Sequence, residues 1–195
     1  MNATAATERA APAPEPTGAQ SLEVALAVAR LLAVDPVGIG GVALRSQAGP
    51  VRDAWLRALR AMLPEGTPWC RVPLHVGEDR LLGGLDLAAT LAAGRPVAES
   101  GLLAAADGGI LILAMAERLA GATASAVTAA MDRGAALVER DGLTLHHVAR
   151  FGVVAIDEGI TEDEGLSPAL ADRLAFRLDL ATIGPRDAML AESAI

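Results

Sequence analysis

Two runs, GGILIL at 108–113 and FGVVAI at 151–156, constrain the fold more than any other feature of this sequence. Each run is apolar at nearly every position, which is typical of a strand that is buried on both faces. Parallel sheets covered by helices on both sides are the usual place for such strands. The two runs therefore predict an α/β fold built on a parallel sheet.

Strand-like and helical segments alternate along the rest of the chain. Further strands are predicted at 41–45, 70–74 and 175–180, and helices at 21–32, 54–63, 85–94, 100–107, 118–134 and 167–174. Ser21 and Ser167 stand where helix N-caps are expected, and Asp35-Pro36 ends the first helix. Strands that alternate with helices in this way imply a parallel sheet flanked by helices.

One segment departs from this alternation. Residues 136–148, ALVERDGLTLHHV, hold two alternating apolar runs on either side of Asp141-Gly142, and an Asp-Gly pair in that setting is a strong hairpin signal. We therefore expect a β-hairpin inserted in one of the crossovers. His146 and His147 are predicted on opposite faces of its second strand, so they form no metal-ligand pair, and we assign no metal site to the chain.

The composition excludes several classes of function. Hydrophobic residues make up 52% of the chain, which indicates a globular protein, and no apolar run reaches the ~20 residues of a membrane span. A net charge of −8, with only 16 Lys and Arg and 2% aromatic residues, argues against a nucleic-acid partner. The single cysteine, Cys70, excludes an internal disulfide and indicates a structural thiol in a cytoplasmic protein.

The segment LRSQAGPVRDAW, residues 44–55, lies between a predicted strand and a predicted helix. A phosphate-binding loop has this position and the pattern G-x-x-x-x-G-K-[ST], in which backbone N–H groups surround the phosphates, Lys reaches them and a hydroxyl holds magnesium. The four required positions hold Ser46, Val51, Arg52 and Asp53, and only Gly49 remains inside the loop. On these residues alone, a plain loop is favoured over a phosphate site.

The strand at 108–113 raises the same question. A hydrolysing ATPase ends this strand with Asp-Glu, because one carboxylate serves magnesium and the other activates the attacking water. Here those places hold Ala114 and Met115, which can do neither. Glu117 comes later, and we expect it to face solvent on the next helix.

Five segments, taken together, resemble the magnesium-chelatase family of AAA+ proteins. They are LLAVDPVGIGGVALRS, HVGEDRLLGGLD, GRPVAESGLLAAADGGILIL, VERDGLTLHHVARF and EGLSPALADRLAFRLDL, and they span roughly Ser21 to Ile183. The resemblance implies an AAA+ fold, a P-loop NTPase-like parallel sheet flanked by helices, with an inserted β-hairpin. The loss of both nucleotide motifs is similar to the family's D subunits, which accompany an active ATPase subunit.

The resemblance also implies a function in chlorophyll or bacteriochlorophyll biosynthesis. In this family, ATP hydrolysis by the active AAA+ subunit is coupled to insertion of Mg²⁺ into protoporphyrin IX by a large porphyrin-binding subunit, an ATP-dependent reaction of the ligase class. The chain is then expected to be a non-hydrolysing member of a hetero-oligomeric ring. It is expected to bind no cofactor tightly, because the partner subunit holds most of the ATP and Mg²⁺ that the complex uses.

The helix at 167–174 carries the residue to which the resemblance gives a catalytic role. In the family, the arginine of an L-x-P-x-L-x-D-R helix reaches across the subunit interface as an arginine finger, and Arg173 occupies that place. A finger stabilises the transition-state charge of phosphoryl transfer. The alternative is a helix-end arginine paired with Asp172 or Asp179. The family's sensor asparagine is not recognisable, although Asp157 or Glu158 stands nearby.

We divide the chain into a flexible Ala- and Pro-rich tail at 1–20, an AAA+ core at 21–184, and the start of a helical lid or a linker at 185–195. The C-terminal integrin-like domain of a D subunit is absent from this chain. The acidic cluster Glu162, Asp163 and Glu164 is interpreted as a solvated loop.

Two other functions stay open. One is an autonomous AAA+ ATPase of the MoxR-like regulatory-chaperone group, which binds and hydrolyses nucleotide on its own. The other is a structural α/β domain that joins no ring. Nucleotide turnover by the isolated domain and association with an ATPase subunit separate these alternatives.

Overall fold

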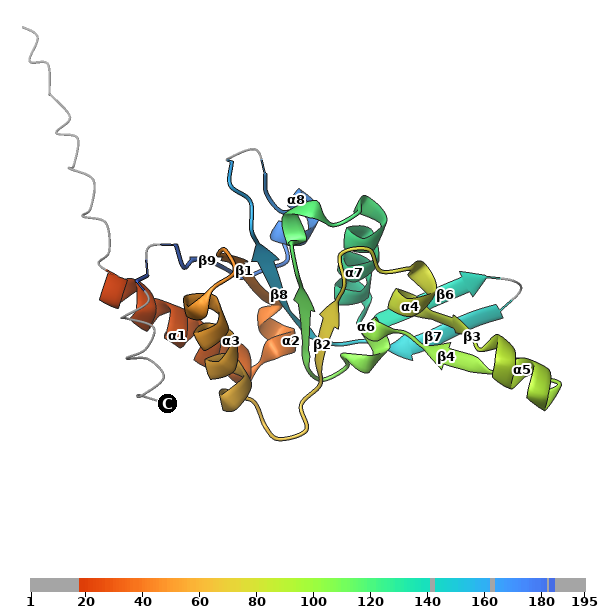
Figure 1. Ribbon diagram of the computed structural model, residues 1–195. Coiled ribbons are helices and arrows are strands. Elements are labelled where there is room, and N and C mark those ends of the chain that lie inside the picture. The colour runs from red at the N-terminus through yellow and green to blue at the C-terminus, as the bar shows by residue number, and fades with distance from the viewer. Residues whose placement is uncertain (1–17, 141–142, 162–163, 182, 185–195) are drawn as a thin grey trace, which may run out of the picture.

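The computed structural model describes residues 18–140, 143–161, 164–181 and 183–184. Its centre is a five-stranded sheet in the order β2-β5-β8-β1-β9, and every pair in it is parallel (Figure 1). The strands are β1 (Gly41–Arg45), β2 (Trp69–Val72), β5 (Ile110–Leu113), β8 (Gly152–Asp157) and β9 (Phe176–Asp179). The predicted α/β fold with a parallel sheet is confirmed.

The two apolar runs form the central strands β5 and β8, and both strands are buried at every position. Side chains alternate between the faces of a strand, so a doubly covered strand needs an apolar residue at each step. In β5, Ile110 and Ile112 join the core on one face, whereas Leu111 and Leu113 join the core on the other.

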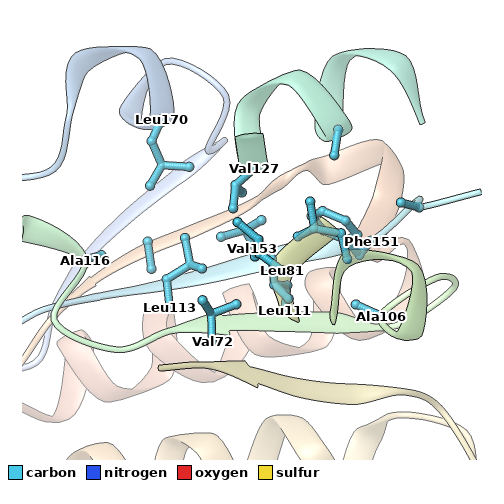
Figure 2. Close-up of a cluster of buried hydrophobic side chains, with 14 of the residues drawn as sticks. Val72, Leu81, Ala106, Leu111, Leu113, Ala116, Val127, Phe151, Val153 and Leu170 are labelled. Atoms are coloured by element: carbon cyan, nitrogen blue, oxygen red, sulfur yellow. The ribbon is translucent and has the colours of Figure 1, made fainter. Parts of the chain in front are cut away.

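Helices cover both faces of the sheet. On one face, α1 (Gly18–Val34) packs beside α3 (Pro50–Met62), and on the other lie α4 (Glu78–Leu82), α6 (Leu102–Ala105), α7 (Gly121–Arg133) and α8 (Pro168–Ala171). Figure 2 shows the second core, where Val127 of α7 and Leu170 of α8 meet Leu113 and Val153 of the sheet. Ser167 caps α8 as predicted, since its hydroxyl accepts the Leu170 N–H at 3.4 Å.

One side-chain hydrogen bond joins the two helices of the first face. Trp55 of α3 is 3% exposed, and its indole Nε1 donates to the carbonyl of Ala25 in α1 at 2.8 Å. A buried indole N–H needs such an acceptor, because leaving it unpaired costs roughly 1–3 kcal/mol. The bond therefore fixes how α1 lies on α3, the helix that follows the 46–49 loop.

Several predicted boundaries differ from the structure by a few residues, and the largest differences lie at the first three helices. The first helix begins at Gly18, so Ser21 lies inside α1 rather than at its cap. After it, a short helix α2 (Pro36–Ile39) replaces the expected turn, and Asp35 caps it by accepting the Gly38 N–H at 2.7 Å. The third helix begins at Pro50 rather than Ala54, because a proline at the first helical position is already set at a helical φ.

Two antiparallel ribbons lie outside the main sheet. The predicted hairpin is confirmed as β6 (Ala135–Arg140) paired with β7 (Leu143–Val148), inserted between β5 and β8. A second ribbon, not predicted, pairs β3 (Gly83–Leu85) with β4 (Ala98–Ser100) and carries α5 (Leu87–Ala93) at its tip. We call residues 83–100 the arm. Figure 1 shows the arm and the hairpin projecting on the same side of the sheet.

Some predictions fall outside the described residues. They concern most of the 1–20 tail, the Asp141-Gly142 turn, Glu162 and Asp163, and the 185–195 segment. Within the described ranges, no helix has both the length and the apolar character needed to cross a membrane.

Candidate functional site

The 46–49 loop joins the carboxyl end of β1 to the amino end of α3, which is the place expected for a phosphate loop. Gly49 precedes the helix with a φ of 163°, an extended conformation open to any residue, and nothing lies within 4 Å of the place a Cβ would take. Pro50, the first helical residue, has no N–H to offer an anion. The retained glycine is therefore not needed for the shape of this loop.

Arg52 stands at the lysine position and is already engaged. It is 9% exposed, and its Nη1 donates to Oε1 of Glu158 at 2.6 Å. Its Nε also lies 3.9 Å from Oδ1 of Asp53, which stands at the position of the magnesium-binding hydroxyl. A cation beside two carboxylates is neutralised locally, so it attracts a phosphate far less than a free lysine does.

Two further contacts close the loop onto the residues that follow β8. The Ser46 N–H donates to the Asp157 carbonyl at 2.9 Å, and Nε2 of Gln47 donates to the Glu158 carbonyl at 2.6 Å. Ser46 itself is 7% exposed, and its hydroxyl donates to the Gln47 carbonyl at 3.1 Å. The Ser46 N–H, the Ser46 hydroxyl and the Gln47 side-chain amide are thus bound to the chain's own oxygens.

Ala114 and Met115 directly follow Leu113, the last residue of β5, and neither side chain can bind a metal ion as a carboxylate does. Met115 is 37% exposed. Its φ is 49°, and in the described part of the chain it is the only residue other than glycine with a positive φ. Glu117 does not face solvent as expected. Its side chain is 1% exposed and its Oε2 accepts the N–H of Glu158 at 3.0 Å, because the 3₁₀ turn at Ala116–Arg118 folds it back toward the end of β8.

Arg173 follows α8 and makes a two-pronged ion pair that the sequence did not predict. Its Nε donates to Oδ1 of Asp132 at 2.7 Å and its Nη2 to Oδ2 of Asp132 at 2.5 Å, while Nη1 donates to the Ala169 carbonyl. The alternative interpretation paired Arg173 with Asp172 or Asp179, and those partners are wrong because the pair is made with Asp132. The Arg173 hydrogen bonds lower the pKa of the Asp132 carboxyl, and Asp132 raises the pKa of Arg173.

The loop and Arg173 lie at opposite ends of β1. The loop follows Arg45, whereas Gly40, just before the strand, is so close to Arg173 that a Cβ there would lie 2.5 Å from the Arg173 carbonyl oxygen. A five-residue strand spans about 13 Å at ~3.3 Å per residue. The structure therefore brings the loop, Asp157 and Glu158 together and keeps Arg173 apart from them.

Sequence reasoning missed the partners of both arginines. Arg52 and Glu158 are 106 positions apart, and Arg173 and Asp132 are 41 apart, so no local spacing links either pair. The position of Glu158 just after a predicted buried strand could have indicated a site residue, whereas nothing in the sequence pointed to Asp132. Cys70, in β2, is half-buried, and burial raises the pKa of its thiol, which fits a structural residue.

The sequence is similar to subunits of magnesium chelatase. A 67 kDa subunit from Chlorobaculum parvum is 43% identical over 155 residues, covering 80% of this chain and 25% of the relative. A 60 kDa subunit from Cereibacter sphaeroides is 42% identical, covering 77% and 23%. A 38 kDa subunit from Rhodobacter capsulatus is 33% identical, covering 87% and 55%. The chain thus spans about a quarter to a half of the length of these relatives. No protein-family profile matches it.

A similar solved structure also comes from magnesium chelatase. A structure of the complex between subunits BchI and BchD of magnesium chelatase, based on a cryo-EM reconstruction, is 30% identical with a TM-score of 0.65, and the match covers 89% of this chain and 63% of the other. NtrX from Brucella abortus matches with a TM-score of 0.60 at 16% identity and so shares the fold alone.

Proposed function

The chain is a homologue of the magnesium-chelatase subunits of the AAA+ class, and on this premise we propose that it is a non-hydrolysing subunit of such a complex. It assembles with an active ATPase subunit in a hetero-oligomeric ring. ATP hydrolysis in that partner drives insertion of Mg²⁺ into protoporphyrin IX by a large porphyrin-binding subunit. The proposal places this complex in the cytoplasm of a bacteriochlorophyll-making cell.

The Arg52–Glu158 pair is the observation that carries the non-hydrolysing part of the proposal. A nucleotide at the 46–49 loop needs a free cation and free N–H donors for its phosphates, and a carboxylate at the end of β5 for magnesium. Here the cation is held by Glu158 at 2.6 Å, Pro50 lacks its donor, and Ala114 stands at the end of the strand. These residues do not fit ATP with Mg²⁺, so both are bound by the partner subunit.

Arg173 gives the chain a part in the partner's reaction. It lies at the other end of β1 from its own loop, and its side chain is 32% exposed. An arginine that reaches the phosphates of a neighbour stabilises the transition state and is worth roughly 10³- to 10⁵-fold in turnover at the site it serves. We therefore assign Arg173 as a finger in trans.

Replacing Arg173 with Ala tests the assignment in the reconstituted complex. We expect ATP-driven chelation to fall while association with the ATPase subunit, measured by pull-down, is unchanged. Arg71→Ala is the matched control, because Arg71 is an exposed arginine on the edge strand β2. Unchanged chelation by the Arg173 variant would remove the finger, and ATP turnover by this chain alone would identify it as an autonomous ATPase instead.

A further inference from the structure

Arg173 lines a hollow of about 380 Å³ with two other arginines. Arg133 is the last residue of α7, and Arg150 lies just before β8. The hollow is at the amino end of β1, since Gly40 also lines it. We call it the Arg173 hollow.

The backbone holds Arg150 in position for this hollow. Its N–H donates to Oδ1 of Asp107 at 2.8 Å, and its carbonyl accepts the Gly108 N–H at 2.6 Å. Its side chain passes over Gly134, where a Cβ would lie 3.0 Å from Cγ of Arg150. Gly134 ends α7 in the left-handed conformation, with a φ of 64°. A larger side chain at position 134 would displace the Arg150 side chain, so Gly134 leaves the space in which Arg150 lines the hollow.

The charge of the hollow is unbalanced. Asp132 is the one carboxylate among its lining residues, and it is paired with Arg173. Within the described part of the chain, no ion pair of Arg133 or Arg150 is found, and both residues are exposed. The chain as a whole carries a net charge of −8, so three arginines around one hollow are a local excess of the opposite sign.

The carboxyl end of α7 explains only part of this excess. The end of a helix carries a partial negative charge of about half a unit, and one cation near it is favourable. Asp172 also acts on the charge of Arg173, and Asp107 accepts the backbone N–H of Arg150, but among the described residues no ion pair of the Arg133 or Arg150 side chain is found, so their charges repel each other and that of Arg173. Such an arrangement is expected where an anion completes the site.

Arg173 still has donors to offer. A guanidinium has five N–H groups, and the bonds to Asp132 and Ala169 use three of them. Asp132 fixes the Nε and Nη2 side of the group, which sets the plane of the guanidinium. We propose that Arg133, Arg150 and Arg173 together form a site for the polyphosphate of a nucleotide held by the neighbouring subunit, in which Asp132 positions Arg173. This inference rests on the proposed function.

Charge-neutral variants of the two flanking arginines test the site in the complex with the ATPase subunit. We expect Arg150→Gln and Arg133→Gln each to raise the KM for ATP by about 2- to 5-fold with little change in kcat, because each removes one exposed charge. Arg150→Lys keeps the charge and should keep most of the affinity. Arg71→Gln, on the exposed edge strand β2, is the matched control.

Asp132 is tested separately as a positioning residue. Asp132→Ala frees the guanidinium of Arg173, so we expect kcat to fall while KM stays within about 2-fold, and Asp132→Asn should fall between the wild type and the alanine variant. Thermal unfolding of each variant shows whether the fold is kept. Equal kcat for wild type and the alanine variant would overturn the positioning role.

The same set of variants distinguishes failure of the three-arginine site from failure of the proposed function. If Arg173→Ala leaves turnover unchanged, the finger itself fails. If Arg173→Ala lowers turnover but the Arg133 and Arg150 variants behave like the Arg71 control, the three-arginine site fails and the finger stands. If those variants weaken subunit association equally with and without ATP, they contact the partner protein rather than its nucleotide, which also overturns the site.

Discussion

A carboxylate lies against each of the two arginines that the sequence singled out, but the two pairs differ in burial. The side chains of Arg52 and Glu158 are 10% and 19% exposed, whereas those of Arg173 and Asp132 are 32% and 51% exposed. Burial makes a lone charge costly, and exposure makes a pair weak. We therefore expect the Arg52–Glu158 pair to affect the stability of the fold, and the Arg173–Asp132 pair to set the orientation of the Arg173 guanidinium.

We expect Glu158→Gln to destabilise the fold by about 3 kcal/mol, because it removes the 2.6 Å partner of the buried Arg52 and leaves only the more distant, exposed Asp53. The double variant Arg52→Met with Glu158→Leu removes both charges and should recover most of the loss. Urea unfolding of Arg52→Met, Glu158→Leu and the double variant measures the coupling. Additive losses would mean that the 2.6 Å pair contributes nothing as a pair.

Asp132 should titrate below the ordinary range of an aspartate. Its pKa is lowered chiefly by the hydrogen bond from Arg173, so its contribution to stability is present above the ordinary pKa and is lost as the pH falls through the lowered value. Carboxyl-carbon NMR titration measures this pKa. In Arg173→Ala the pKa should rise toward the ordinary value, and an unchanged value would show that Arg173 is not its cause.

At the scale of the elements, sequence patterns predicted the long and buried pieces. The runs of β5 and β8 are predictable because they are apolar at nearly every position, and the hairpin β6–β7 because two alternating apolar runs flank an Asp-Gly pair. The ribbon β3–β4 of the arm was not predicted, because each strand has only three residues, two of those in β3 are glycines and all three in β4 are exposed. The start of α3 was missed because its first turn, from Pro50, is polar and looks like loop.

Gly41, the first residue of β1, and Gly49, just before α3, should respond differently to alanine. Gly41 has a φ of 145°, and a Cβ there would lie 2.0 Å from the carbonyl oxygen of Val153, so we expect Gly41→Ala to cost ~3 kcal/mol or more. Gly49 is extended and has open space around it, so Gly49→Ala should change stability by less than ~0.5 kcal/mol. Denaturant unfolding measures both. A large loss at Gly49 would mean that the loop still needs its glycine.

At the scale of the whole molecule, the fold was predictable and the site was only partly so. The order of strands and helices along the chain follows from local patterns, whereas the pairing of β1 with β8 in the sheet does not. The pairing of Arg52 with Glu158, and the return of Glu117 to the end of β8, depend on how loops fold across the sheet edge. No period or spacing in the sequence encodes those contacts.

The arm should be dispensable for folding. It forms its own two-stranded sheet, and its helix α5 contributes no side chain to the described buried cores. Leu85 and Ala98 are paired, so residues 86–97 can be replaced by Asn-Gly, which makes a two-residue hairpin. We expect the Tm to shift by only a few degrees with unfolding still cooperative, as measured by circular dichroism. Loss of a cooperative transition would place the arm in the folding unit.

Because Arg173 and the 46–49 loop are separated by the length of β1, the two ends of the molecule differ in the residues they present. In a head-to-tail ring, the finger end of each subunit meets the loop end of the next one. Under the function proposed above, this chain supplies Arg173 at the first end and binds no nucleotide at the second. A ring made only of its own copies would contain no competent site, whereas every mixed junction with the right orientation would contain one. Turnover should then depend on the ratio in which the two kinds of subunit are made, with an excess of this chain acting as an inhibitor.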